Sequence, residues 1–162
     1  MKIGLYIHIP FCQQKCLYCD FPSYDNLIHL YQPYVAALCR EISGLGGVLS
    51  GDIVDTIYIG GGTPTVLSAN CLSQILQQVF ASFIIAKNAE ISIEANPGTV
   101  DFDKLLALRA AGVNRISFGV QSFYDPLLLA IGRIHSATQG VEAIKMAKKA
   151  GFIKMEMEKW GI

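Results

Sequence analysis

Cys12-Gln13-Gln14-Lys15-Cys16-Leu17-Tyr18-Cys19 places three cysteines within eight residues, immediately after an apolar run from Leu5 to Phe11. Neither spacing between the cysteines forces a regular helix or strand, so one short loop can turn all three sulfurs inward around a soft metal centre. Zinc would need a fourth protein ligand, whereas an iron–sulfur cube held by three thiolates leaves one iron open to a substrate. No fourth ligand is obvious nearby, because Cys39 and Cys71 lie in apolar helical patterns. The loop favours an iron–sulfur centre, with zinc or three unrelated buried thiols as the alternatives.

The same residues resemble a known family. Three cysteines with an aromatic Tyr18 before the last are similar to the cluster-binding C-x-x-x-C-x-x-C loop of radical S-adenosylmethionine (SAM) proteins. The tract Tyr6-Ile7-His8-Ile9-Pro10-Phe11-Cys12 resembles the oxygen-independent coproporphyrinogen III oxidase group, and within it the heme chaperone branch. The oxidases of that group carry a further cysteine two positions after the third, where this chain has Phe21. This difference argues against the oxidase itself.

Short apolar segments alternate with amphipathic helical patterns along the whole chain, which predicts an α/β fold with right-handed βαβ units and a parallel sheet. The first strand is predicted to be buried on both faces, and Gly44, Gly46 and Gly47 are predicted to end the first helix. The family resemblance implies a partial parallel (β/α) barrel, with about four and a half of the usual six βα units present. The predicted strands cover residues 3–9, 53–59, 89–95, 114–120 and 152–157, and the helices cover 31–45, 71–83, 104–111 and 139–150.

Residues with chemical potential follow the carboxyl ends of the predicted strands, where parallel α/β folds place their sites. The resemblance implies that the cysteines bind a [4Fe–4S] cluster and that a second set of residues binds SAM. That set is Tyr6, Gly61, Gly62, Thr63, Glu94, Gln121 and Arg133. All but Gln121 have a plainer alternative: core packing for the tyrosine, a tight turn for the glycines and Thr63, a rim carboxylate for the glutamate and a surface ion pair for the arginine.

Composition limits the possible environments of the chain. Its 162 residues are 52% hydrophobic, enough for a sizeable core, and 13 basic residues balance 13 acidic ones, which gives no electrostatic case for a nucleic-acid partner. No secretory signal is visible, and no apolar run reaches the ~20 residues of a membrane helix. An odd number of cysteines, five, fits reduced thiols better than a disulfide framework. We therefore expect a cytoplasmic protein without an integral membrane segment.

The resemblance ends near Phe152. Family members continue into an aspartate that contacts SAM and then a Tyr-Gly-Leu-Pro turn, whereas this chain has Glu158 as the candidate for the aspartate's place. We expect residues 1–162 to be an incomplete radical SAM core domain that lacks the C-terminal domain associated with heme. The implied function is heme binding and delivery, with a tetrapyrrole and an electron donor as partners and heme itself bound in the full-length parent. The alternatives are SAM-dependent oxidative decarboxylation of coproporphyrinogen III and an inactive fragment, so the sequence leaves open whether the chain is an enzyme.

Overall fold

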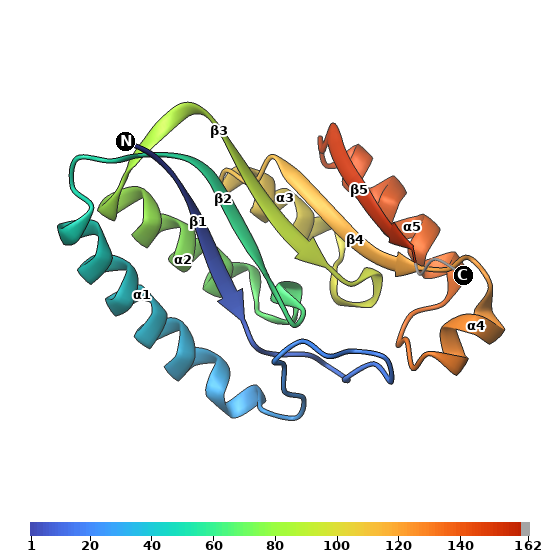
Figure 1. Ribbon diagram of the computed structural model, residues 1–162. Helices are drawn as coiled ribbons and strands as arrows, with labels where there is room; N and C mark the ends of the chain where they lie inside the picture. The colour runs from blue at the N-terminus through green and yellow to red at the C-terminus, as the bar shows by residue number, and fades with distance from the viewer. Residues whose placement is uncertain (160–162) are drawn as a thin grey trace.

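The computed structural model describes residues 1–159 as one parallel sheet with helices packed along one side of it (Figure 1). The five strands lie in sequence order, β1-β2-β3-β4-β5, and every neighbouring pair is parallel. This arrangement confirms the predicted α/β class and the partial barrel. The strands are β1 (Lys2–Ile9), β2 (Ile53–Gly61), β3 (Ile84–Ala95), β4 (Arg115–Gln121) and β5 (Lys154–Lys159).

The helices connect successive strands and leave the opposite face of the sheet open, as Figure 1 shows. Within residues 1–159, no helix is both long and apolar enough to span a bilayer. The α-helices are α1 (Tyr31–Val48), α2 (Ala69–Ser82), α3 (Phe102–Ala110), α4 (Asp125–Ala130) and α5 (Ala137–Lys149), and the short 3-10 helices are η1 (Ile28–Leu30), η2 (Pro64–Val66) and η3 (Pro97–Thr99).

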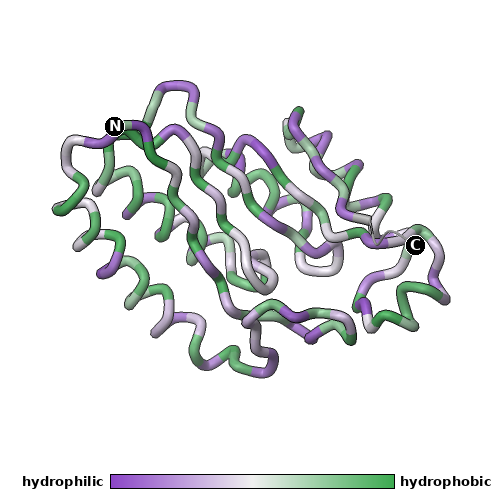
Figure 2. Tube along the Cα trace, viewed as in Figure 1, coloured by the Kyte–Doolittle hydropathy of each residue, from purple (hydrophilic) through white to green (hydrophobic). Residues whose placement is uncertain are grey.

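The core lies between the sheet and the helices. Ile59 and Ile93 from neighbouring strands are fully buried, as are Leu76 of α2 and Phe118 of β4. Successive side chains of a strand point to opposite faces, so the alternate residues of each strand face away from the helices. The alternation of hydrophobic and hydrophilic residues along the strands can be followed in Figure 2.

The prediction that the first strand is buried on both faces was wrong. Burial alternates along β1, and Tyr6 is 57% exposed on the open face of the sheet. The open face is polar elsewhere too: Arg115 forms ion pairs with Glu90 and Glu156, and Lys154 with Glu90. These pairs are partly exposed, so each contributes little to the stability of the fold.

Two predicted boundaries also differ from the structure by three residues or more. Helix α1 continues through Gly44, Gly46 and Gly47 to Val48, because tertiary packing outweighs the weak helix propensity of glycine. At Gly46 an added Cβ would lie 2.5 Å from the carbonyl oxygen of Ser82, so a glycine there lets α1 approach the end of α2. Strand β3 begins five residues earlier than predicted, at Ile84 rather than 89, because residues 84 and 85 pair with the start of β2 before the register shifts.

Polar caps set the starts of the helices that follow the site loops. Ser68 accepts a hydrogen bond from the amide of Cys71 at the start of α2, and Asp101 accepts one from Lys104 at the start of α3. Helix α5 begins with a complete capping box between Ser136 and Gln139. These caps satisfy amides that have no partner inside the helix.

Replacing Ser136 with alanine is expected to lower the free energy of unfolding by about 1 kcal/mol, because the Gln139 amide loses its acceptor. Chemical denaturation followed by circular dichroism measures this change. Ser43→Ala, at an exposed position inside α1, is the matched control and is expected to change stability by less than about 0.5 kcal/mol. Equal effects of the two substitutions would contradict a stabilising cap at Ser136.

Candidate functional site

The cysteine loop leaves the end of β1 and is tied to it by backbone hydrogen bonds. The amide of Cys12 donates to the carbonyl of Tyr24 at 2.9 Å, and the amide of Tyr24 donates to the carbonyl of Pro10 at 2.8 Å. His8 adds a side-chain link, because its Nε2 lies 3.1 Å from the carbonyl oxygen of Pro22 and its Nδ1 lies 3.0 Å from the Tyr6 hydroxyl. His8 is therefore a hydrogen-bonded residue that links the chain after the loop, at Pro22, to β1.

The three cysteines of the loop are free thiols in different surroundings. Cys12 is buried, and its Sγ lies 3.7 Å from the Thr63 hydroxyl. Cys16 and Cys19 are partly exposed, and the Arg133 guanidinium donates to Cys16 Sγ at 3.2 Å. No group of three or more His, Cys, Asp or Glu side chains in residues 1–159 is arranged around a single metal ion. An iron–sulfur cube does not require three ligands around a single ion, because each thiolate binds a different iron atom.

The glycine tract after β2 packs directly against the cysteine loop. The amide of Gly62 donates to the carbonyl of Ile9 at 2.8 Å, and that of Thr63 donates to the carbonyl of Phe11 at 2.7 Å. Gly61 has φ +116°, a conformation that favours glycine, and a Cβ there would lie 2.7 Å from the imidazole of His8. The tract is therefore more than a tight turn, since it holds the segment that leads from β1 into the loop.

A cavity of about 350 Å³ lies between this tract, the cysteine loop and the carboxyl ends of β3, β4 and β5. Seven of the ten candidate residues line it: Cys19, Gly61, Gly62, Thr63, Glu94, Gln121 and Arg133. The other three lie outside this lining. Tyr6 stacks on Tyr58, with ring centroids 6.1 Å apart, while Cys12 lines a different cavity and Cys16 contacts Arg133.

Glu94 is the main acid of this cavity, and both of its oxygens are engaged. The Tyr58 hydroxyl donates to Oε1 at 2.5 Å, and the Gly61 amide donates to Oε2 at 3.1 Å. Burial raises the pKa of Glu94, the nearby Glu158 carboxylate raises it further, and the two hydrogen bonds lower it. The plainer alternative for Glu94 was a rim carboxylate whose hydrogen bonds come from neighbouring backbone. Only one of its two donors, the Gly61 amide, is backbone; the other is the Tyr58 side chain.

Arg133 is a partly buried residue of the site, not the surface ion pair that was its alternative. Its guanidinium donates to Cys16 Sγ and to the carbonyl of Gly119, and its Nε is buried without a hydrogen-bond partner among the described residues. Gln121 lies beside it at the end of β4 with φ 64°. A left-handed conformation is uncommon for a residue other than glycine and tends to occur at functional sites.

Glu158 lines the same cavity from β5, and Ser117 donates to its Oε1 at 3.0 Å. The candidate for the aspartate's place thus faces the predicted site. Sequence reasoning missed Tyr58 and Ser117 as parts of this network. A signal was present, because both residues alternate with buried positions and share the open face with Tyr6 and Glu94.

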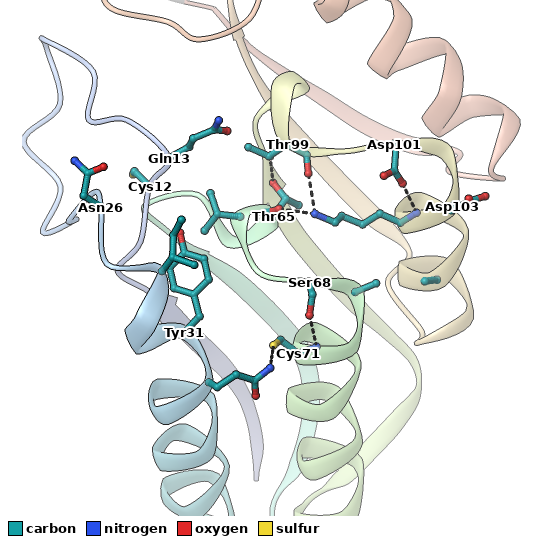
Figure 3. A pocket seen from close by; sticks show the side chains of 16 residues that line it. Cys12, Gln13, Asn26, Tyr31, Thr65, Ser68, Cys71, Thr99, Asp101 and Asp103 are labelled. Carbon is teal, nitrogen blue, oxygen red and sulfur yellow. Dashed lines mark hydrogen bonds between the residues drawn. The ribbon is translucent and has the colours of Figure 1, made fainter.

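A larger cavity of about 970 Å³ lies on the helix side, between the N-terminal ends of α1, α2 and α3 (Figure 3). The hydroxyls of Thr65 and Thr99 meet at 2.6 Å on its wall, and Lys104 donates to the carbonyls of both threonines at 2.9 Å. Cys12 lies at its margin. This cavity was not anticipated from the sequence, because its lining comes from several separated segments without a common motif.

Comparisons with known proteins agree with this architecture. The family model described as the Radical SAM superfamily matches residues 6–157. The chain is 42% identical over 157 residues to the heme chaperone HemW of Escherichia coli K12, covering 96% of this chain and 42% of that protein. It is 40% identical over 168 residues to the heme chaperone HemW of Synechocystis, covering 100% of this chain and 39% of that protein.

A solved structure matches the fold equally well. Coproporphyrinogen III oxidase (HemN) from Escherichia coli, a radical SAM enzyme, superimposes with a TM-score of 0.89 at 32% identity, covering 95% of this chain and 36% of that one. The chain thus spans about two fifths of the length of the relatives it matches. The order of the strands, the cysteine loop after β1 and the match over residues 6–157 lead to one conclusion: this chain belongs to the Radical SAM superfamily.

Proposed function

We propose that Cys12, Cys16 and Cys19 hold a [4Fe–4S] cluster and that the 350 Å³ cavity binds SAM beside it. Membership of the superfamily implies both cofactors. The observation that supports this assignment most is the shared cavity, which joins the third cysteine to residues from the ends of β2, β3 and β4. The chemistry that the two cofactors supply when bound is one-electron cleavage of the SAM sulfonium to a 5′-deoxyadenosyl radical.

The residues present fit these groups. Three thiols in one loop are a soft donor set that suits iron–sulfur ligation and leaves one iron without a protein ligand. The buried Nε of Arg133 lacks a partner among the described residues, and a carboxylate such as that of SAM would supply one. Added Cβ atoms at Gly61 and Gly62 would lie 2.7 Å from the His8 ring and 2.6 Å from the Phe11 carbonyl oxygen, so these glycines let the tract pack directly beside the entry to the cysteine loop.

Each residue of the proposed SAM site then has a definite task. Glu94 accepts hydrogen bonds from a cationic amino group, and Arg133 donates to a carboxylate. Gly61, Gly62 and Thr63 present backbone groups along the bound methionine part. Gln121 lines the cavity from β4, and Tyr6 covers the open face next to Tyr58.

For the full-length protein, we propose heme binding and delivery. The curated relatives are named heme chaperones, and Phe21 stands where the oxidases of the resembled group carry a further cysteine. Phe21 lines the cavity and is 59% exposed. The proposal includes an electron donor for the cluster and a cytoplasmic location. All five cysteines are free thiols, as in a reducing compartment.

Oxidative decarboxylation of coproporphyrinogen III is the second candidate, because the structural match to the oxidase HemN is close. Measuring protoporphyrinogen formation under anaerobic reduction, alongside a hemin titration followed by absorbance, separates the two functions. Binding of hemin without product favours delivery, and product formation favours the oxidase. If the chain neither binds hemin nor forms the product, it is inactive without the further sequence that its relatives contain.

Anaerobic reconstitution with iron and sulfide, followed by reduction and electron paramagnetic resonance, tests the cofactor site itself. We expect a reduced [4Fe–4S] signal that changes when SAM is added, because SAM ligates the iron that has no thiolate. A cluster signal that is indifferent to SAM would contradict the SAM site but not the cluster site. Failure to form a cluster would overturn the proposal for this chain.

A further inference from the structure

The carboxylate of Glu94 is held by two donors from the preceding strand. Its Oε1 accepts the Tyr58 hydroxyl at 2.5 Å and its Oε2 accepts the Gly61 amide at 3.1 Å. A carboxylate offers about four lone-pair positions, so two remain for a ligand. Only one of the two donors is a side chain, and sequence reasoning gave it no role.

Tyr58 reaches Glu94 across the open face of the sheet. It pairs with Ser92, two residues before Glu94 on the adjacent strand, so both side chains point to the same face. The ring is supported on its other side by Tyr6, at an interplanar angle of 24°. An added Cβ at Gly60 would lie 2.7 Å from the Tyr58 ring and 3.1 Å from the Glu94 carboxylate. A glycine at position 60 thus makes room for this contact.

We propose that Tyr58 is a positioning residue for Glu94, and that its hydroxyl orients the carboxylate toward bound SAM. This inference rests on the proposed SAM site. Tyr58 does not line the cavity itself, so it acts through Glu94 and not by touching the ligand. Burial and the contact with Glu94 raise the pKa of the Tyr58 phenol, which keeps the hydroxyl protonated and able to donate at neutral pH.

Tyr58→Phe removes one oxygen atom and leaves the ring stacked on Tyr6. We expect the dissociation constant for SAM to rise about fivefold to tenfold in the reconstituted protein, measured by equilibrium dialysis with labelled SAM, because a hydrogen bond to a charged group is lost. Iron and sulfide content is measured in parallel and is expected to stay unchanged. Tyr34→Phe is the matched control: it removes a hydroxyl that donates at 2.5 Å to the carbonyl of His8, and SAM binding is expected to stay unchanged.

A double-mutant cycle with Glu94→Ala separates positioning from a general structural effect. Glu94→Ala alone is expected to weaken SAM binding at least about tenfold. Adding Tyr58→Phe to Glu94→Ala should then have no further effect, because the carboxylate that Tyr58 orients is gone.

The outcomes distinguish the two proposals. Absence of SAM binding by the unmodified reconstituted protein overturns the proposed site and this inference with it, as does unchanged binding in Glu94→Ala. If Glu94→Ala weakens binding while Tyr58→Phe binds SAM normally, the site stands and the role of Tyr58 is refuted. A loss from Tyr58→Phe that is equally large with and without Glu94 also refutes positioning through Glu94.

Discussion

Cys16→Ala is expected to lower the yield of reconstituted [4Fe–4S] cluster at least about tenfold. Loss of a residue that only supports a metal ligand already weakens metal binding by about that factor, so loss of a ligand itself should cost at least as much. Cys16 is the middle one of the three proposed ligands, and within the loop the amide of Cys19 donates to the carbonyl of Cys16 at 3.2 Å. Two remaining thiols cannot hold a cube against hydrolysis. Iron and sulfide analysis and the reduced paramagnetic signal both measure the loss.

Cys39→Ala is the matched control for this substitution. Cys39 is a partly buried free thiol of α1 outside the loop, and we expect its replacement to leave the cluster yield unchanged. A cluster yield in Cys16→Ala equal to that of the unmodified chain would show that the loop is not the ligand set. Equal losses in Cys16→Ala and Cys39→Ala would point to a general loss of folded protein instead.

The fold could be predicted from the sequence because its strands and helices differ strongly in pattern. An apolar segment that runs into Gly61, Pro97 or the cysteine loop predicts a strand that ends at a loop. Parallel strands bring their carboxyl ends to one edge, so residues as far apart as Gly61, Glu94 and Arg133 could be expected to meet. They do meet in one cavity.

The predictions that were wrong concern features that depend on contacts between segments distant in the sequence. The glycines of α1 read locally as a helix end, but Gly46 packs on the Ser82 carbonyl. The early start of β3 depends on pairing with β2. The open face of the sheet was missed at β1, because Leu5 and Ile7 are apolar and the exposed Tyr6 between them reads as core. Strand alternation indicates the face that Tyr58 occupies, but its contact with Glu94 depends on the register of β2 against β3, which no local pattern provides.

The glycine tract provides the other large expected effect. Gly62→Ala is expected to lower both stability and cluster yield, because an added Cβ would lie 2.6 Å from the carbonyl oxygen of Phe11 and 3.0 Å from Cys12 Sγ. The carbonyl belongs to the residue just before Cys12, so it cannot move without displacing Cys12, the first of the proposed ligands. Overpacking of this kind costs about 1–3 kcal/mol of unfolding free energy. Chemical denaturation and iron analysis of the same preparation measure the two effects.

Gly47→Ala supplies the control, since a Cβ at this exposed position of α1 would meet nothing within 4 Å. Alanine is the better helix former, so we expect Gly47→Ala to raise the unfolding free energy by about 0.5–1 kcal/mol and to leave the cluster yield unchanged. The same substitution is thus expected to lower the unfolding free energy at one glycine and raise it at the other, so the difference reports the surroundings of each glycine. A Gly62→Ala protein as stable and as rich in cluster as the unmodified chain would show that the loop tolerates displacement of Cys12, and that the glycine contact does not position the first thiolate.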